Sequence, residues 1–302
     1  MGIPPCHLDK SLCLCYLKEK SPCERSKAVK VGILIKPGIK EGKQLAQKLE
    51  RWLKARGAKA YSTEMDMRKG KTLPRGLDLL IVLGGDGTML YAASLVGQSG
   101  VPVLGVNLGG LGFLTEVKKT ELFPLLKKFL AGKVHLEERM MLKASVDTGR
   151  TKRGFFALNE FTIAKKTLSR MIELETRVDG IYLASFRADG LIVSTPTGST
   201  AYCMAAGGPI VHPSMQCLVL IPICAHTLTS RPLVVPASSA VEVRLRIPGT
   251  EAHLTVDGRN GMKLKRDQRL VIKAAEEGLA LINSPSMDYY AILHTKLHWG
   301  DR

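Results

Sequence analysis

The chain has 302 residues; 45% of them are hydrophobic, 24% are charged, and the formal net charge is +17. This composition is typical of a globular protein and excludes a disordered chain, and the length allows roughly two domains. No apolar run approaches the ~20 residues that span a bilayer. The short apolar segment Leu12–Leu17 does not fit a secretory leader, because Asp9 stands where a basic flank is expected.

Seven cysteines are an odd number, no two of them form a CxxC pair, and four lie within the first 23 residues. In a chain of this length they indicate reduced thiols, so we predict a cytoplasmic protein. The excess of basic residues has three possible explanations: binding of nucleic acid, binding of small anionic substrates, or a basic surface that only faces solvent. Because stacking aromatic residues are not interleaved with the charges, we expect no nucleic-acid partner, and we expect no membrane partner either.

Residues 1–27 show no sustained periodicity and are expected to form a flexible N-terminal extension. Over residues 28–137, short apolar strands alternate with helical patterns, which predicts a Rossmann-like α/β domain of three layers. Asp78–Leu83, DLLIVL, is typical of a buried parallel strand. The other predicted elements are the strands Val31–Ile35, Ala58–Tyr61 and Val101–Val106 and the helices Glu41–Arg56, Met89–Leu95 and Leu122–Leu130.

Beyond Glu137 the pattern changes from helical to alternating. Met171–Val178 and Ile181–Arg187 flank Asp179-Gly180, the kind of two-residue turn that joins a β-hairpin, and a second such turn is Asp257-Gly258. We therefore predict a β-rich domain over residues 138–283. The tail, residues 284–302, is expected to pack back on the first domain.

The strand Asp78–Leu83 runs directly into Gly84-Gly85-Asp86-Gly87-Thr88, GGDGT. Glycines let a phosphate approach the backbone, and the free N–H groups of a helix start point at the anion. A carboxylate there repels phosphates unless it holds a divalent cation or accepts a proton, so Asp86 is the candidate catalytic residue. Thr88 would cap the helix or contact the phosphate. A turn with an N-cap and no ligand is the plain alternative.

Two further segments suit a nucleotide. Asp189–Tyr202, DGLIVSTPTGSTAY, packs five hydroxyl side chains around a proline and a glycine, and its tyrosine could stack on a base. Asn159-Glu160 interrupts the apolar stretch Phe155–Ile163, and an amide beside a carboxylate can read a base or a ribose. The alternatives are a loop of turn-forming residues for the first segment and a strand edge for the second.

GGDGT, Asn159-Glu160 and DGLIVSTPTGSTAY followed by GGPIVHP together resemble the NAD kinase family, whose members make NADP from NAD. Val106–Thr115 and Pro222–Val235 resemble stretches of the same family, and the likeness extends from about Val29 to the C-terminus. GGDGT alone is less specific, since lipid kinases and phosphofructokinases carry it or a close variant, whereas the longer motif is highly specific.

The resemblance implies a two-domain homodimer or homotetramer with the active site between its halves. It implies transfer of a phosphoryl group from ATP or polyphosphate to the 2′-hydroxyl of the adenosine ribose of NAD, with Asp86 accepting the hydroxyl proton. A divalent cation such as magnesium would bridge the donor phosphates, and Asp86 would contact a metal ion only when that ion is bound to the donor. The residues implied to bind NAD or the donor are Gly84, Gly85, Asp86, Gly87, Thr88, Asn159, Glu160, Arg170, Arg187, Asp189, Thr200, Ala201, Tyr202, Cys203, Met204 and Ala205.

Two positions depart from the family pattern. Ala205 stands where many members have a serine, and Arg259 stands where Gln or Asn is common in bacterial members. Two alternatives are a lipid kinase of the diacylglycerol or sphingosine type and a catalytically silent NAD-binding protein. The first usually has Asn-Glu almost directly after GGDGT, where this chain has Met89-Leu90-Tyr91. The second is expected to lose the acidic residue or the glycines, which are intact here.

Overall fold

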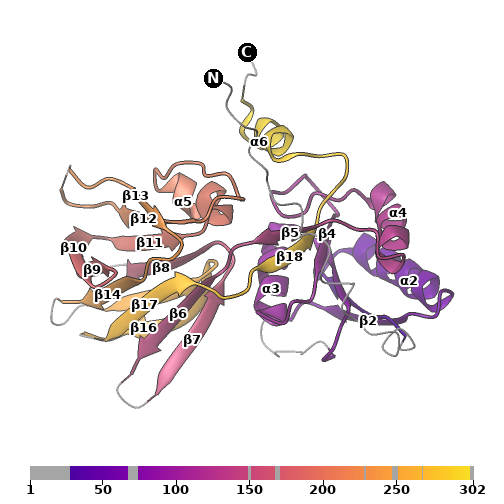
Figure 1. Ribbon diagram of the computed structural model, residues 1–302, viewed down its shortest axis with the longest axis horizontal. Helices are drawn as coiled ribbons and strands as arrows, with labels where there is room; N and C mark the ends of the chain where they lie inside the picture. Colours follow the sequence, from indigo (N-terminus) through magenta and orange to yellow (C-terminus); the bar gives the residue numbers. More distant parts are fainter. Residues whose placement is uncertain are drawn as a thin grey trace, which may run out of the picture. The chain divides into compact units, whose positions relative to one another are not determined.

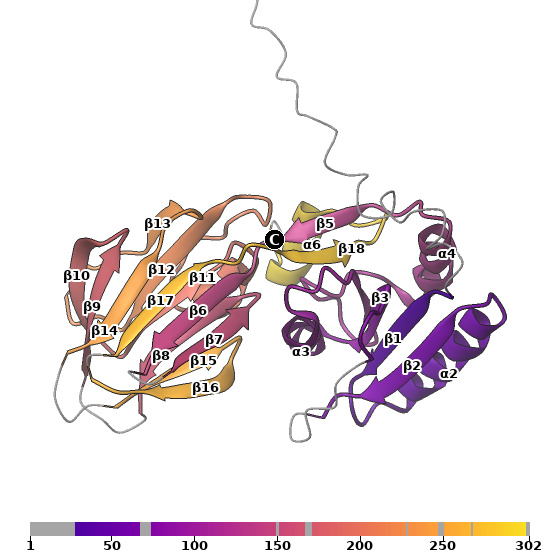
Figure 2. The same ribbon diagram turned by 60° about the horizontal axis from the view of Figure 1, so that its bottom comes forward.

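The computed structural model describes residues 28–66, 74–148, 151–166, 171–227, 229–246, 251–266 and 268–299 (Figures 1 and 2). They form two compact units. One unit runs to Gly85 and adds Pro102–Glu137 and Leu281–Ile292; the other holds Asp86–Val101, Glu138–Ala280 and the chain from Leu293. The extension predicted at residues 1–27 lies outside the described residues, and the domain boundaries predicted from the sequence stay predictions.

The first unit is built on a six-stranded sheet with the order β2-β1-β3-β4-β18-β5. Strand β1 pairs in parallel with β2 and β3, and β4 pairs in parallel with β3 and β18. All six residues of β3 are buried, which explains its continuous apolar sequence. The strands are β1 (Lys30–Ile35), β2 (Lys59–Glu64), β3 (Leu79–Gly84), β4 (Val103–Asn107), β5 (Leu136–Arg139) and β18 (Leu279–Ile282).

Two helices, α2 (Lys40–Lys54) and α4 (Lys119–Leu130), pack on this sheet and share one core with it (Figure 1). Leu49 of α2 and Leu122 of α4 are fully buried in that core. The rings of Trp52 and Phe123 join the two helices with centroids 5.5 Å apart. The α/β class predicted for this part of the chain is therefore confirmed.

The second unit contains two six-stranded antiparallel sheets whose inner faces share a single hydrophobic core (Figure 2). Val241, Val243 and Leu245 are buried, as the alternating sequence predicted. One sheet has the order β10 (Ile181–Ala188), β9 (Ile172–Val178), β14 (Val241–Leu245), β17 (Arg269–Ala274), β6 (Leu142–Asp147), β7 (Lys152–Ala157). The other has the order β13 (Leu233–Pro236), β12 (Cys217–Ile223), β11 (Gly190–Ser194), β8 (Glu160–Lys165), β15 (Ala252–Val256), β16 (Arg259–Leu264).

Both predicted hairpin turns are confirmed. Asp179 and Gly180 have φ angles of 53° and 81°, and Asp257 and Gly258 have φ angles of 48° and 71°. Two consecutive positive φ angles define the type I′ turn, which matches the twist of the flanking strands. Aspartate and glycine tolerate this left-handed conformation better than most residues do, and this explains their place at both turns.

Strand β11 is buried on both faces, and residues of the hydroxyl-rich segment that follows it cover the face that points away from the core between the sheets. Leu191 and Val193 lie in the core between the sheets, whereas Ile192 packs with Cys203 and Val211 in a separate cluster. The segment continues as a short 3-10 helix, η3 (Thr197–Thr200), and a helical turn, α5 (Tyr202–Ala205).

Two further helices complete the description. Helix α3 (Asp86–Val96) begins three residues before the predicted start at Met89, and α6 (Tyr289–Leu297) lies near the C-terminus. Cys203, Cys217 and Cys224 are free. Within the described ranges, no helix has the length and apolar character needed to cross a membrane.

We expect that replacing Gly190 with alanine will destabilise the second unit. An added Cβ at Gly190 would lie 2.4 Å from the carbonyl oxygen of Ile163 on the neighbouring strand. Forced overpacking of this kind costs about 1–3 kcal/mol in the free energy of unfolding. At Gly154 the nearest atom to an added Cβ is 4.0 Å away. Gly154→Ala is therefore the matched control, with a change within about 0.5 kcal/mol. Equal denaturant midpoints for the two variants would contradict this prediction.

Candidate active site

The carboxylate of Asp257, in the turn between β15 and β16, binds the chain just before β8. Its two oxygens accept hydrogen bonds from the backbone N–H groups of Leu158 (3.0 Å), Asn159 (2.8 Å) and Glu160 (3.2 Å). The N–H of Asp257 in turn donates to the carbonyl of Glu160 at 3.0 Å. This closed set of hydrogen bonds fixes the backbone of the Asn159-Glu160 pair.

The hydroxyl-rich segment binds the same stretch of backbone from another side. The hydroxyl of Thr195 donates to the carbonyl of Leu158 at 2.7 Å, and its backbone N–H donates to the carbonyl of Asn159 at 2.8 Å. The hydroxyl of Ser194 reaches the same carbonyl at 3.2 Å. An added Cβ at Gly198 would lie 2.3 Å from this oxygen, so only glycine permits the contact.

Three buried oxygen atoms in this region have no hydrogen-bond partner within the described part of the chain: Oδ1 of Asn159, Oε2 of Glu160 and Oγ1 of Thr197. Their residues are only 9%, 5% and 7% exposed. Buried polar groups are nearly always hydrogen-bonded, and leaving one unsatisfied costs about 1–3 kcal/mol. Three such atoms around one corner of the sheet indicate a site for a ligand that carries N–H or O–H donors.

The protonation of Glu160 is unusual. Burial raises the pKa of its carboxyl group from 4.5 to about 8, and the nearby carboxylate of Asp257 adds to the rise. Burial also raises the pKa of Asp257, against the lowering effect of the three N–H groups that it accepts. Glu160 is therefore the group of this pair that is protonated at neutral pH, and it can act as donor as well as acceptor.

Asp86 is the first residue of helix α3. A carboxylate at this end of a helix interacts favourably with the helix dipole. Added Cβ atoms at Gly85 and Gly87, on either side of it, would meet nothing within 4 Å, so the backbone is open to a ligand. Thr88 is the third residue of α3 and is only 3% exposed, so it does not occupy the capping position before the helix, and its contact with a phosphate stays a prediction.

The remaining predicted residues differ in what they can offer a ligand. The carboxylate of Asp189 pairs with Lys165 at 2.7 Å, and the side chain of Arg187 is exposed. Tyr202 is 46% exposed, as stacking on a base requires. Cys203 is fully buried and the pKa of its thiol is raised to about 11, so its backbone alone could contact a ligand. Arg170 lies outside the described residues. Gly84 is buried at the end of β3, and Thr200, Ala201, Met204 and Ala205 occupy η3, α5 and the residue between them.

Sequence reasoning missed two contributors. The sequence alone indicates Asp257 only as a turn residue and Arg259 only as a departure from the family pattern. The guanidinium of Arg259 donates to the hydroxyl of Ser94 (3.0 Å) and to the carbonyl of Leu90 (3.3 Å), both on helix α3. No local sequence signal reveals either role, because each depends on residues that are far away along the chain.

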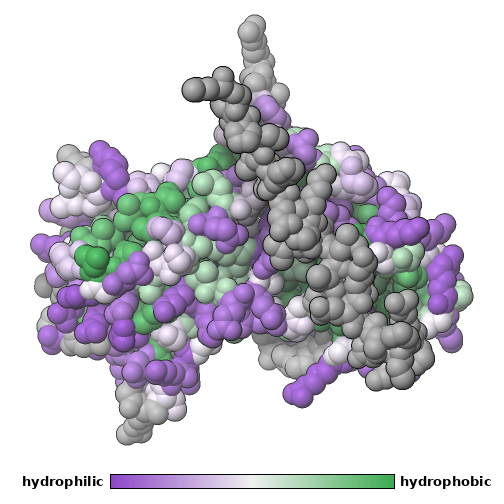
Figure 3. All heavy atoms as spheres, viewed as in Figure 1, coloured by the Kyte–Doolittle hydropathy of each residue, from purple (hydrophilic) through white to green (hydrophobic). Residues whose placement is uncertain are grey.

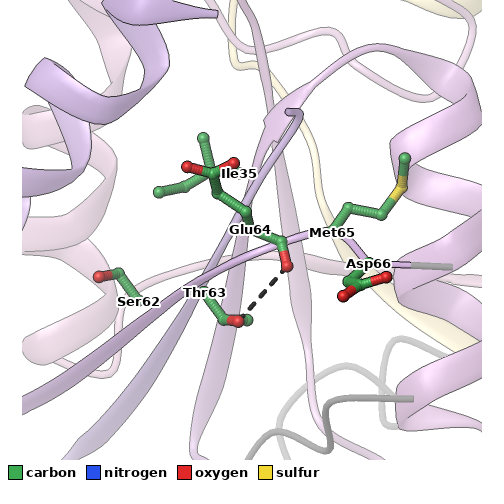
Figure 4. Close-up of a pocket in the computed structure, with 6 residues that line it drawn as sticks. All are labelled: Ile35, Ser62, Thr63, Glu64, Met65 and Asp66. Atoms are coloured by element: carbon green, nitrogen blue, oxygen red, sulfur yellow. Dashed lines mark hydrogen bonds between the residues drawn. The ribbon is translucent and has the colours of Figure 1, made fainter. Parts of the chain in front are cut away.

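The first unit has a polar pocket of about 590 Å³ at the carboxyl ends of β1 and β2 (Figure 4). Strand β3, which ends at Gly84, pairs with β1 at the same edge of the sheet. Ligands of open α/β sheets bind outside the carboxyl ends of the strands. The lining contains two carboxylates and no basic side chain, although one of them, Glu64, pairs with Lys43 at 2.6 Å, so the pocket itself supplies no cation to a phosphate. The lining residues are Ile35, Ser62, Thr63, Glu64, Met65 and Asp66.

Within the described ranges, no three His, Cys, Asp or Glu side chains gather in a way that could hold a metal ion. Magnesium is commonly held by one or two carboxylates together with the phosphates of a substrate. The residues present therefore fit a cation that arrives with a phosphorylated ligand, with Asp86 as the nearby carboxylate.

Comparison with known proteins decides the family. Residues 68–134 match the ATP-NAD kinase N-terminal domain, and residues 158–284 match the ATP-NAD kinase C-terminal domain. The chain belongs to the NAD kinase family. It is accordingly a phosphotransferase, and the resemblance found in its motifs is confirmed.

Relatives cover nearly the whole chain. An NAD kinase of Geotalea daltonii is 46% identical over 268 residues, which span 85% of this chain and 94% of the relative. An NAD kinase of Geobacter sulfurreducens is 44% identical over 282 residues, 90% of this chain and 99% of the relative. These matches favour neither a lipid kinase nor a catalytically silent protein.

Solved structures share the fold. Yeast NADH kinase, in complex with NADH, superposes with a TM-score of 0.81 at 22% identity and covers 91% of this chain and 89% of its own. An NAD kinase from Archaeoglobus fulgidus, in complex with ATP, gives a TM-score of 0.72 at 24% identity and covers 89% and 98%. The two-domain fold of an α/β part and a β-rich part is thus that of the NAD kinases.

Replacing Glu160 with glutamine should remove a pH dependence of stability. Because the pKa of Glu160 is raised in the folded protein, its ionisation opposes folding, and stability is lost as pH rises from 4.5 towards about 8. Glutamine has no charge to bury, so the free energy of unfolding of Glu160→Gln should rise relative to wild type by ~1.4 kcal/mol for each pKa unit crossed.

The measurement is urea unfolding at several pH values within this window, with Glu242→Gln as the matched control. The hydrogen bond from Arg269 lowers the pKa of Glu242, so that carboxylate stays charged throughout the window. Its substitution should shift stability by a constant amount. Parallel pH profiles for wild type and Glu160→Gln would contradict the assignment.

Proposed function

We propose that the chain transfers a phosphoryl group from ATP, or from polyphosphate, to the 2′-hydroxyl of the adenosine ribose of NAD. Membership of the NAD kinase family supports the reaction. The observation that carries the site is the group of unpartnered buried atoms on Asn159, Glu160 and Thr197. The amino groups and ribose hydroxyls of a dinucleotide supply the donors that these atoms lack.

NAD would bind to groups that the fold already holds still. Asn159 and Glu160 are fixed through their backbone N–H groups by Asp257, so little entropy is lost when they receive a ligand. Protonated Glu160 could donate one hydrogen bond and accept another. Tyr202 is placed to stack on a ring, and Arg170, Arg187, Asp189 and the run from Thr200 to Ala205 complete the proposed contacts.

Asp86 would act as the general base. Its carboxylate would take the proton of the 2′-hydroxyl while that oxygen forms a bond to the terminal phosphorus of the donor. The bond from phosphorus to the bridging oxygen breaks, and ADP, or a shortened polyphosphate, leaves with the electron pair. The products are NADP, ADP or the shortened polyphosphate, and one proton, which Asp86 passes to solvent.

The donor phosphates would lie against the glycines beside Asp86. Open backbone at Gly85 and Gly87 and the N-terminus of α3 offer N–H groups to an anion. A divalent cation, magnesium in our proposal, would come with the donor and neutralise part of the phosphate charge. The net charge of +17 would raise the local concentration of both anionic substrates.

We also propose a cytoplasmic homodimer or homotetramer. Free thiols such as that of the exposed Cys224 suit a reducing compartment. Hydrophobic side chains gather over the region of β10, β12 and β13 (Figure 3), and β10 and β13 are edge strands of their sheets. Ile181 is 74% exposed and Val234 is 47% exposed. Exposed apolar edge strands favour association with another chain.

The proposed reaction predicts that purified protein forms NADP from NAD, Mg²⁺ and either ATP or polyphosphate. General-base catalysis is worth roughly 10²–10⁴-fold, so Asp86→Asn should lower kcat by at least about that range. NAD binding, measured by calorimetry, should change little, because Asn159 and Glu160 are untouched. No product with any donor would overturn the function, and near-normal kcat of Asp86→Asn would overturn the role of this residue.

The association proposed through the edge strands is tested by sedimentation. Wild type should sediment as a dimer or tetramer, and Ile181→Glu combined with Val234→Glu should reduce its mass, because buried charge opposes association. Lys152→Glu, on the edge strand β7 at the other end of its sheet, is the control and should keep the mass of wild type. An unchanged mass for the double variant would exclude this surface.

A further inference from the structure

Arg259, the first residue of β16, binds helix α3 through three contacts. One guanidinium nitrogen donates to the hydroxyl of Ser94 at 3.0 Å, and the other terminal nitrogen donates to the carbonyl of Leu90 at 3.3 Å. The guanidinium carbon also lies 5.8 Å from the centre of the Tyr91 ring, within the range of a cation–π interaction. All four residues belong to the second unit.

Helix α3 contains no basic residue in its own sequence. Asp86, in its first turn, is the single charged residue of its sequence, and the last turn carries no basic residue. Arg259 brings a cation to the C-terminal half, where the helix dipole is negative. The hydroxyl of Ser94 donates its own hydrogen to the carbonyl of Tyr91 at 2.7 Å, so its lone pairs are available to Arg259.

The same turn also holds the proposed NAD site. Asp257 lies two residues before Arg259 and binds the N–H groups of Asn159 and Glu160. Both Asp257 and Gly258 have positive φ angles, which gives the turn one tight conformation. A single rigid turn therefore connects the Asn159-Glu160 pair to the helix that begins with Asp86.

We infer that Arg259 is a positioning residue, which sets the place of helix α3 and thereby of the Asp86 carboxylate relative to the acceptor bound at Asn159-Glu160. The inference rests on the proposed function. A reacting group displaced by about 1 Å can lose roughly 10²-fold in rate, whereas the binding of a substrate held by other residues is little affected. Arg259 should accordingly act on kcat rather than on KM.

The chemistry of arginine suits this task. Its planar fork can donate to two acceptors at once, here a hydroxyl and a carbonyl four residues apart on one helix face. Lysine keeps the charge but offers a single point donor. Arg259→Lys should therefore restore only part of the activity that Arg259→Ala loses. If the charge alone mattered, lysine should restore all of it.

The first measurement compares steady-state kinetics of Arg259→Ala with wild type. We expect kcat to fall by roughly 10–100-fold while KM for NAD stays within about 3-fold. Arg269→Ala is the matched control, because Arg269 is an arginine of the same unit that donates to Glu242, away from helix α3. Its kinetic constants should equal those of wild type.

The second measurement is a double-mutant cycle with Asp86→Asn. If Arg259 acts by placing Asp86, then Arg259→Ala should lower the residual kcat of the Asp86→Asn protein by less than about 3-fold. The effects of substituting two residues that act together are not additive. A role in general stability predicts the same fold-loss in both backgrounds. Should Arg259→Ala not fold, Ser94→Ala replaces it; losing one hydrogen bond should lower kcat by roughly 2–10-fold.

The outcomes separate the two proposals. Wild-type protein that makes no NADP would overturn the proposed function itself. Active wild type together with an Arg259→Ala protein that matches Arg269→Ala, or that loses equal activity with and without Asp86, would overturn the positioning role alone. A kcat loss that disappears in the Asp86→Asn background and is partly restored by lysine would establish it.

Discussion

The carboxylate of Asp257 accepts hydrogen bonds from three consecutive backbone N–H groups, at Leu158, Asn159 and Glu160, which lie 97 to 99 residues earlier in the chain. Charge-assisted hydrogen bonds are about twice as strong as neutral ones, and here they satisfy donors at the start of a central strand. The pairing of β8 with β11 and β15, and the place of the proposed NAD-binding pair, both depend on this contact.

The same contact produces an electrostatic conflict. Two carboxyl groups are buried side by side, and only one of them receives backbone N–H groups. The charged form of Glu160 is therefore disfavoured by burial and by the nearby carboxylate, and its pKa rises to about 8. With Asn159 and Thr197 it leaves buried oxygen atoms without partners, each at a cost of about 1–3 kcal/mol. Instability of this kind is common at binding sites, because a ligand with matching donors relieves it.

The GGDGT motif by itself indicates a phosphate site but does not identify the acceptor. Gly84 and Gly85 end the first of the three segments that form the first unit, whereas Asp86 begins a helix that groups with the second unit and is bound by Arg259. Glycines and a helix start explain how phosphate could be held, but they do not name the acceptor. The acceptor is indicated by Asn159-Glu160 and by the hydroxyl-rich loop, which bind each other's backbone.

The sequence by itself indicated the main strands and helices of the first unit, both hairpin turns, the α/β and β-rich classes and the family resemblance. Patterns of period two and 3.6, and Asp-Gly pairs that tolerate positive φ, are local properties, so Val241–Leu245 and the turn at Asp257 could be predicted. The apolar stretch Phe155–Ile163 was less clear, because the break between β7 and β8 depends on Asp257. Only the tertiary structure decided that Glu160 is buried beside Asp257, that Cys203 lies in the core and that Arg259 reaches helix α3. Each of these facts depends on residues that are distant in the sequence and pack together in the fold. The burial of a side chain and its protonation are set by that packing.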